Sequence, residues 1–237
     1  MTVLIIIPTY NERDNLPPLV RALLADPLRR VMVVDDQSPD GTGEIADKLA
    51  HEFSGRVTVV HRSGKRGLGR SYVEGIALAI RTDVDLICQM DADFSHDPKY
   101  LPDLIQATSD ADVVIGSRYL HGISVVNWPL RRLVLSTLAN AYIRNITRMP
   151  IKDCTGAFRC WRRAALADLG SQRFTSEGYA FQVEMLYMAW RRGYRIVEVP
   201  IVFTERRQGS SKLSAGILLE SVFAPWRLIA RRGKPAR

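Results

Sequence analysis

The chain has 237 residues, of which 46% are hydrophobic, 8% aromatic and 24% charged. This length and composition predict one globular α/β domain, or at most two small ones, and exclude disordered, collagen-like, coiled-coil and repeat architectures. The 33 basic and 25 acidic residues give a net charge of +8. Such a surplus indicates an anionic partner: nucleic acid, a membrane surface or a phosphorylated substrate.

Targeting and redox features point to the cytoplasm. The longest apolar runs are far shorter than the roughly 18 to 20 residues that span a bilayer. Met1 is followed by a strand-like run without a basic segment or a small-residue cleavage site, so we expect no signal peptide. The three cysteines, Cys88, Cys154 and Cys160, form no CxxC pair and are expected to be buried or idle thiols.

Short aliphatic runs alternate with helix-like stretches through the first half of the chain. The runs predict strands at 3–7, 31–34, 57–60, 86–90 and 113–115, and the stretches predict helices at 16–24, 43–53, 71–80 and 100–108. This alternation predicts βαβ units and a mostly parallel sheet covered by helices on both faces. In such sheets, ligands bind beyond the carboxyl ends of the strands.

The alternation ends at about Trp128. A long helix is predicted from there to Arg148, followed by a strand at 157–160, a helix at 180–190 and a strand at 195–199. Without any linker, we predict one domain over 1–215 and an amphipathic basic tail over 216–237.

Asp91 and Asp93 flank one small residue at the end of a predicted strand. Both carboxylates can therefore face the same divalent cation, which would keep room for diphosphate oxygens and water. The alternative role, capping the next helix, is already filled by Asp97 followed by Pro98. We therefore predict a metal site at Asp91 and Asp93.

Asp35 and Asp36 end another apolar strand, and one of them is expected to bind a ribose or base. Two common phosphate loops are missing, because Tyr72 stands where a third glycine would be needed after Gly67 and Gly69, and no Gly-Lys-Ser/Thr sequence occurs. NAD and P-loop chemistry are thus disfavoured, and a diphosphate would depend on the metal.

Together these segments resemble the inverting family 2 glycosyltransferases of GT-A fold, a Rossmann-like architecture. The resemblance rests on PTYNE at 8–12, DDQSPDGT at 35–42, MDADFSH at 90–96 and GSRY at 116–119. Further segments at 153–159, 178–184 and 206–212 are similar to the dolichyl- and polyprenyl-phosphate mannose synthases within that family. The likeness extends from residue 3 to about residue 214.

The resemblance implies a role for individual residues. Catalytic roles fall to Asp93, Arg118 and Arg206, and the acceptor phosphate would be bound by Arg118, Arg159 and Arg206. Donor binding would involve Pro8, Tyr10, Glu12, Val34, Asp36, Asp91, Ala92, Asp93, Arg118, Arg206 and Lys212. Some members carry Gln as a third metal ligand where this chain has Ser95, so water or His96 would complete the shell.

The implied reaction is inverting and depends on Mg²⁺ or Mn²⁺: mannose passes from GDP-mannose to a polyprenyl or dolichyl monophosphate. A phosphate monoester, with a second pKa of about 6, is mostly dianionic at neutral pH and needs no general base. Asp153 is therefore expected to form a turn or orient an arginine. Alternatives are a glucosyl version that uses UDP-glucose, another family 2 cell-wall transferase, or a module that only binds a nucleotide sugar or nucleic acid. Nucleic acid is disfavoured by the lack of aromatic stacking platforms with interleaved basic residues.

Two amphipathic stretches are candidates for contact with a membrane. The helix from Trp128 is expected either to lie at the interface or to face the core, with equal weight. The stripe from Ile217 to Ile229, followed by the basic tail, favours a membrane surface, because aromatic anchors and cations both attract it. We expect a peripheral enzyme on the cytoplasmic face, with or without a membrane-spanning partner that anchors it.

Overall fold

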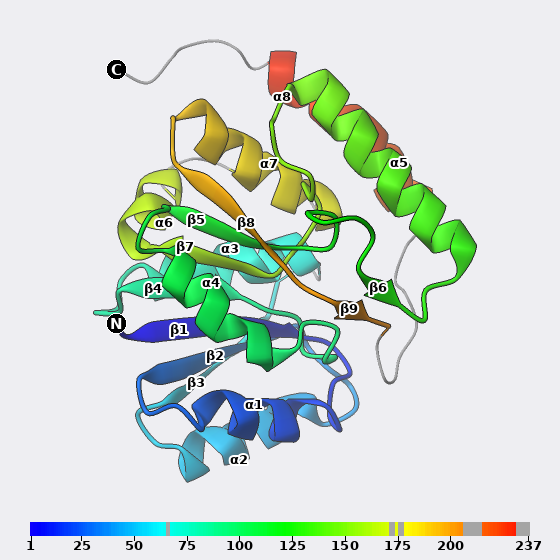
Figure 1. Cartoon of the computed structure of the whole chain (residues 1–237). Coiled ribbons are helices and arrows are strands. Elements are labelled where there is room, and N and C mark those ends of the chain that lie inside the picture. Colours follow the sequence, from blue (N-terminus) through cyan, green and yellow to red (C-terminus); the bar gives the residue numbers. More distant parts are fainter. Residues whose placement is uncertain (65–66, 171–173, 175–177, 206–214, 231–237) are drawn as a thin grey trace.

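The structure is a computed structural model that describes residues 1–64, 67–170, 174, 178–205 and 215–230. Its centre is a seven-stranded sheet in which only β7 runs antiparallel to its neighbours (Figure 1). From edge to edge the strands are β3 (Val57–His61), β2 (Arg29–Asp35), β1 (Val3–Thr9), β4 (Leu86–Gln89), β7 (Arg159–Arg162), β5 (Val113–Ser117) and β8 (Ile196–Pro200). The predicted mostly parallel sheet is thus confirmed.

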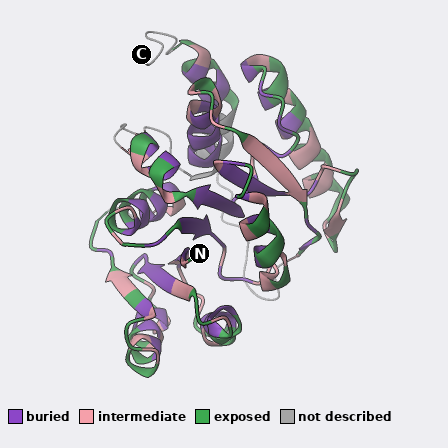
Figure 2. Cartoon of the chain, turned by 60° about the vertical axis from the view of Figure 1, so that its left-hand side comes forward, coloured by how far each residue is buried: buried purple, intermediate pink, exposed green. Residues whose placement is uncertain are grey.

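Helices cover both faces of this sheet, which explains why its strands are almost continuously apolar. One face packs against α1 (Leu16–Leu24), α2 (Thr42–Glu52) and α4 (Leu101–Ala107). The other packs against α3 (Leu68–Ala79), α6 (Arg163–Gly170) and α7 (Gly178–Arg191). Coloured by burial, the central strands are mostly buried and the exposed residues lie on the outer sides of the helices (Figure 2).

A glycine brings α3 close to the sheet. A Cβ atom at Gly75 would lie 2.9 Å from Cγ2 of Ile6 and 3.0 Å from Cγ2 of Val34, closer than real Cβ contacts. Ile6 on β1 and Val34 on β2 are both completely buried, so neither side chain could move away from such a Cβ atom. Gly75 therefore allows α3 to pack directly over these two strands.

Two long helices, α5 (Leu130–Thr147) and α8 (Ala215–Ala230), lie side by side at one end of the molecule (Figure 1). Trp226 Nε1 donates a hydrogen bond to Tyr142 Oη, and Tyr142 Oη donates to the carbonyl of Val222, both at 2.8 Å. Leu228 is buried in a core cluster that includes Ile143. The first part of the predicted tail is thus a helix packed on the domain, and residues 231–237 lie outside the described part of the chain. Among the described residues, no helix is both long and apolar enough to cross a membrane.

The predicted elements are confirmed with shifts of a few residues at their ends. Sequence patterns missed α6 and a small two-stranded parallel sheet formed by β6 (Val125–Val126) and β9 (Phe203–Thr204). The predicted start of α4 is a separate 3₁₀ turn, η1 (Pro98–Tyr100), whose cap is Asp97 as expected: Asp97 Oδ1 accepts the N–H of Lys99 at 3.0 Å. All three cysteines are buried free thiols, also as expected.

Candidate active site

Three loops meet at the carboxyl edge of the sheet, after β1, β2 and β4. Each contains one residue in the left-handed region of backbone space: Asn11 with φ 60°, Gln37 with φ 58° and Phe94 with φ 60°. Such φ values are uncommon for residues other than glycine and cluster at binding and catalytic sites. The loops after β1 and β2 are also joined directly, because the Asn11 N–H donates to Ser38 Oγ at 3.1 Å and the Glu12 N–H donates to Thr42 Oγ1 at 2.9 Å.

The structure separates the roles of the two acids after β2. Asp35 is tied into the local turn, where its Oδ1 accepts hydrogen bonds from Thr9 Oγ1 at 3.0 Å and Ser38 Oγ at 2.6 Å. Asp36, also buried, forms an ion pair with Arg62 and accepts the Gly67 N–H at 2.7 Å. Both acids are thus bound by groups of the protein itself, and Asp36 stands one residue beyond β2.

Other predicted donor residues surround the same edge. Pro8, Tyr10 and Glu12 are half-buried, and Glu12 Oε2 accepts a hydrogen bond from Asn15 Nδ2 at 2.9 Å. Val34 differs, because its side chain is completely buried in the core beneath α3. The structure therefore gives no support to a direct side-chain contact between Val34 and the donor. Ala92 is likewise packed into the core.

Asp91 and Asp93 lie in the loop after β4, as the sequence predicts. Asp93 is mostly buried, and its Oδ1 accepts hydrogen bonds from the backbone N of Ser95 at 3.1 Å and from Ser95 Oγ at 2.5 Å. The Asp91 side chain is 32% exposed, and its Oδ1 lies 3.5 Å from Tyr72 Oη. Burial and the neighbouring charge of Asp91 raise the pKa of Tyr72, so its hydroxyl keeps its proton. Two oxygen-donor groups are thus close to the surface of the edge.

His96 does not match the role of a third metal ligand. Its Nδ1 accepts the backbone N–H of Asp91 at 3.0 Å, which occupies that nitrogen and indicates a neutral ring. The ring is buried, stacks on Phe158 at 5.0 Å and meets Phe203 edge-on at 5.5 Å. Burial lowers the pKa of His96, which also favours the neutral form. No group of three or more His, Cys, Asp and Glu side chains suited to a metal occurs in the described residues.

Arg118 directly follows β5, and its guanidinium is held by Asp153. Nε and Nη2 of Arg118 donate to the two carboxylate oxygens of Asp153, both at 2.7 Å, and Nη2 also donates to Thr155 Oγ1 at 2.8 Å. Asp153 is completely buried, which by itself would raise its pKa, but the charge and hydrogen bonds of Arg118 outweigh burial and hold this pKa below its usual range. The contact between Asp153 and an arginine that the orienting role requires is therefore present.

Arg159 requires a correction. It is completely buried, and its guanidinium donates to the backbone carbonyls of Gly156 at 2.8 Å, Gln182 at 2.7 Å and Cys154 at 3.1 Å. Burial lowers its pKa to about 10. A guanidinium already bonded to three carbonyls inside the protein is not available to an acceptor phosphate, so we assign Arg159 a structural role that joins β7 to α7.

A mostly apolar cavity of about 370 Å³ lies between α5, α7 and α8. Its apolar lining includes Leu135, Leu138, Ile143, Val183, Val222 and Pro225. Four polar residues also line it: Arg118, Arg132, Ser136 and Thr155. The cavity therefore combines an apolar wall with two arginines.

The two arginines of the cavity share an aromatic ring. The guanidinium carbon of Arg132 lies 4.2 Å from the centre of the Trp128 ring, and that of Arg118 lies 5.6 Å from the same centre. Arg118 also lies 5.5 Å from the ring of Phe203, which contacts His96 beside Asp91. A chain of ring contacts thus connects the cavity to the loop that carries the predicted metal ligands.

The position of Arg132 in the cavity lining was not predicted from the sequence. A signal was present, because Arg132, Ser136 and Asn140 repeat every fourth residue and form a polar line on a helix with many apolar residues. Two other predicted phosphate ligands, Arg206 and Lys212, lie outside the described residues.

Polar loops at the carboxyl edge of a mostly parallel sheet, two carboxylates after one of its strands and an apolar cavity with arginines are features of a ligand-binding α/β fold. The family model for glycosyl transferase family 2 matches residues 4–170. The chain belongs to this family, and it is a glycosyltransferase.

Two relatives match nearly the whole chain. Polyprenol monophosphomannose synthase of Mycolicibacterium smegmatis is 46% identical over 96% of this chain and 88% of its own. Undecaprenyl-phosphate mannosyltransferase of Micrococcus luteus is 45% identical over 98% and 96%. Among solved structures, glucosyl-3-phosphoglycerate synthase of Mycobacterium tuberculosis, in complex with Mn²⁺, UDP and glucosyl-3-phosphoglycerate, covers 99% of this chain and 81% of its own, with 19% identity and a TM-score of 0.66. This last likeness confirms the fold.

Proposed function

We propose that the enzyme transfers mannose from GDP-mannose to a polyprenyl or dolichyl-type monophosphate with inversion at the anomeric carbon. The observation that carries this proposal is the apolar cavity lined by Arg118 and Arg132. Apolar walls suit a prenyl chain, and guanidinium groups suit a phosphate. The names of the two whole-chain relatives, both mannose transferases that act on a polyprenyl-type lipid, support the same acceptor.

On the donor side, the proposal assigns the nucleoside to the loops after β1 and β2, near Tyr10, Glu12 and Asp36. Asp91 and Asp93 would hold a Mg²⁺ or Mn²⁺, because carboxylate oxygens are the ligands these ions prefer and a magnesium ion commonly keeps several waters. Two protein carboxylates with phosphate oxygens and water suffice for such an ion. When bound, the metal supplies positive charge that stabilises the departing diphosphate.

The transfer itself needs few protein groups. An oxygen of the acceptor phosphate forms the bond to the anomeric carbon, and the bond from that carbon to the diphosphate breaks, which releases GDP. The nucleophile is already ionised at neutral pH, so no side chain has to remove a proton. Arg118, fixed by Asp153, would hold the attacking phosphate against its repulsion from the donor, and Arg132, Arg206 and Lys212 would add charge.

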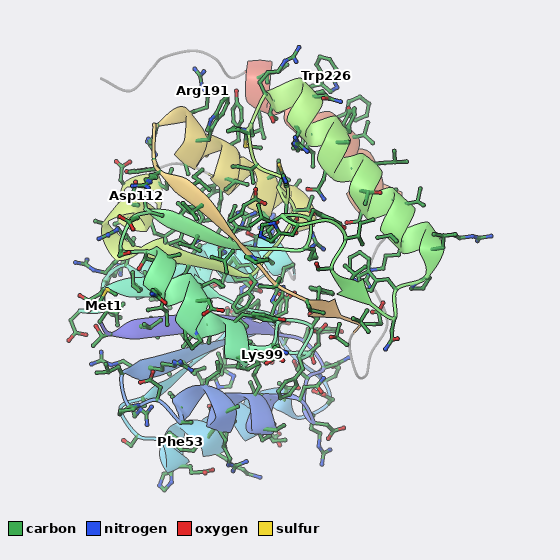
Figure 3. The ribbon with its side chains drawn as sticks, viewed as in Figure 1. Met1, Phe53, Lys99, Asp112, Arg191 and Trp226 are labelled. Atoms are coloured by element: carbon green, nitrogen blue, oxygen red, sulfur yellow. The ribbon has the colours of Figure 1, made fainter. Side chains whose placement is uncertain are left out.

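The surface beside the cavity suits a membrane. Seven large apolar side chains are exposed on α5 and α8, each by 47% or more: Leu130, Val134, Leu135, Leu138, Val222, Phe223 and Trp226. Trp226 lies on α8 where that helix runs beside α5 (Figure 3). An exposed apolar patch flanked by arginines is typical of membrane contact, so the enzyme would dock peripherally on the cytoplasmic face, where a lipid phosphate is presented.

A panel of donors tests the sugar and the base. Thermal shift with GDP-mannose, UDP-glucose and UDP-GlcNAc, each with Mn²⁺, should give the largest stabilisation with GDP-mannose, because stabilisation grows with ligand concentration relative to its dissociation constant. A larger shift with UDP-glucose would instead favour a polyprenyl-phosphate glucosyltransferase.

A further inference from the structure

The two arginines of the cavity have carboxylate partners of very different kinds. Asp153, the partner of Arg118, is completely buried and accepts hydrogen bonds from the backbone N of Arg118 at 3.0 Å and of Gly156 at 2.9 Å as well as from the guanidinium. Such a carboxylate is fixed by the fold. It will stay with Arg118 whatever ligand enters the cavity.

Glu205, the partner of Arg132, is placed differently. Both of its carboxylate oxygens accept from Nη1 of Arg132, Oε1 at 2.6 Å, and the two side chains are 26% and 25% exposed. It stands one residue beyond the two-residue strand β9, held through its backbone N–H to the carbonyl of Val126 at 3.0 Å. A rotation of the Glu205 side chain would release Arg132 without disturbing the seven-stranded sheet.

We infer that the Glu205 carboxylate and the acceptor phosphate bind the same guanidinium, that of Arg132, in turn. Glu205 leaves Arg132 when the acceptor binds. A partly buried arginine needs a counter-charge while the cavity is empty, and Glu205 provides it. A dianionic phosphate brought to the same guanidinium would repel that carboxylate and replace its hydrogen bonds. This inference rests on the proposed acceptor, and it adds a residue that sets acceptor affinity.

If Glu205 and the acceptor phosphate compete for Arg132, then Glu205 lowers the affinity for the phosphate of the acceptor and not for its prenyl chain. Removing its charge should strengthen binding of a prenyl phosphate and leave binding of the uncharged prenyl alcohol unchanged, since the alcohol does not compete for Arg132. A merely structural Glu205 would give the opposite pattern, because a disordered cavity weakens both ligands.

The test measures equilibrium binding of farnesyl phosphate and of farnesol to the full chain. Glu205→Gln should bind farnesyl phosphate about three- to fivefold more tightly, the change expected for a partly exposed ion pair, with farnesol unchanged. Asp83→Asn is the matched control, because it removes the carboxylate partner of another arginine, Arg30, in an exposed ion pair near the start of β4. It should leave the affinities for farnesyl phosphate and farnesol unchanged. Unchanged or weaker binding of farnesyl phosphate by a folded Glu205→Gln protein overturns the inference.

A second measurement uses the unaltered chain. The ¹³C chemical shift of the Glu205 carboxylate should change when farnesyl phosphate binds, because the carboxylate loses its two hydrogen bonds from Arg132, and should not change with farnesol. An unchanged shift with bound farnesyl phosphate speaks against release. The proposed function is separable: if farnesyl phosphate binds as described but receives no mannose, that function fails and the Glu205 exchange stands. If mannose is transferred while Glu205→Gln keeps the native affinity for farnesyl phosphate, the function stands and the exchange fails.

Discussion

Replacing Asp153 with Asn tests whether this residue orients Arg118 or acts as a base. The substitution keeps the shape of the side chain but removes the buried charge that faces Nε and Nη2 of Arg118. Removing one partner of a buried ion pair leaves the other uncompensated and costs about 3–5 kcal/mol. At about 2–4 °C per kcal/mol for a chain of this size, the melting temperature should fall by about 6–20 °C.

The pKa of Asp153 also predicts how the loss of stability in Asp153→Asn changes with pH. The pKa of Asp153 is lowered in the folded protein, so the pair stabilises the fold above the unfolded pKa of about 4 and loses this contribution as the pH falls through the lower folded value. The difference in melting temperature between the native enzyme and Asp153→Asn should therefore be constant from pH 5 to 8 and shrink only in stronger acid.

Thermal unfolding and steady-state kinetics together decide between the two roles. An orienting Asp153 predicts loss of stability and of kcat/KM in parallel, since Arg118 becomes free to move. Full stability combined with abolished transfer would refute the orienting role and indicate that Asp153 removes a proton from the acceptor.

Three other sets of substitutions probe the same site and the surface beside it. Arg118→Lys should fold but lose most of kcat/KM, because lysine keeps the charge and loses the two-pronged contact with Asp153 and phosphate; native kinetics would remove Arg118 from the site. Asp93→Asn should abolish the metal-dependent activity, and full activity with an unchanged metal requirement would show the metal assignment to be wrong. Leu130→Ser combined with Phe223→Ser, two exposed residues outside the cavity lining, should weaken sedimentation with anionic liposomes and slow transfer to a long-chain acceptor more than to farnesyl phosphate; equal losses on both acceptors would mean that the patch serves the fold.

Each of the last two predictions has a matched control in the chain. Asp97→Asn changes a carboxylate four residues from Asp93 that caps η1 and forms an exposed ion pair with Lys99, so it should cost about 1 kcal/mol of stability and leave the metal requirement intact. Val73→Ser combined with Leu78→Ser removes two exposed apolar side chains on α3, away from α5 and α8, and should not affect liposome binding.

The elements of the sheet could be predicted because strands buried on both faces must be apolar, and their ends carry polar residues that have no other reason to be there. Asp91, Asp93 and Asp36 were predicted as site residues in this way. The burial of Arg159 could not be predicted, because one of its three acceptor carbonyls depends on how α7 packs: Gln182 lies 23 residues further along the chain. A single arginine in a motif looks the same in sequence whether it faces a ligand or the core.

Glu205 and Arg132 show a second limit. They lie 73 residues apart and meet only because β9 pairs with β6 beside α5, a two-residue contact too short to leave a pattern. The apolar stripe of α5 had two interpretations in the sequence, and the core-facing one does not hold for Leu130 and Leu138, which are 74% and 62% exposed.

The most direct test of the central claim is the product formed from GDP-mannose and farnesyl phosphate in the presence of Mn²⁺, identified by NMR. We expect a single mannosyl phosphate whose anomeric configuration is opposite to that of the donor, with none formed when the metal is chelated. A product that retains the donor configuration, or no mannosyl phosphate while UDP-glucose yields a glucosyl phosphate, would contradict the proposed reaction.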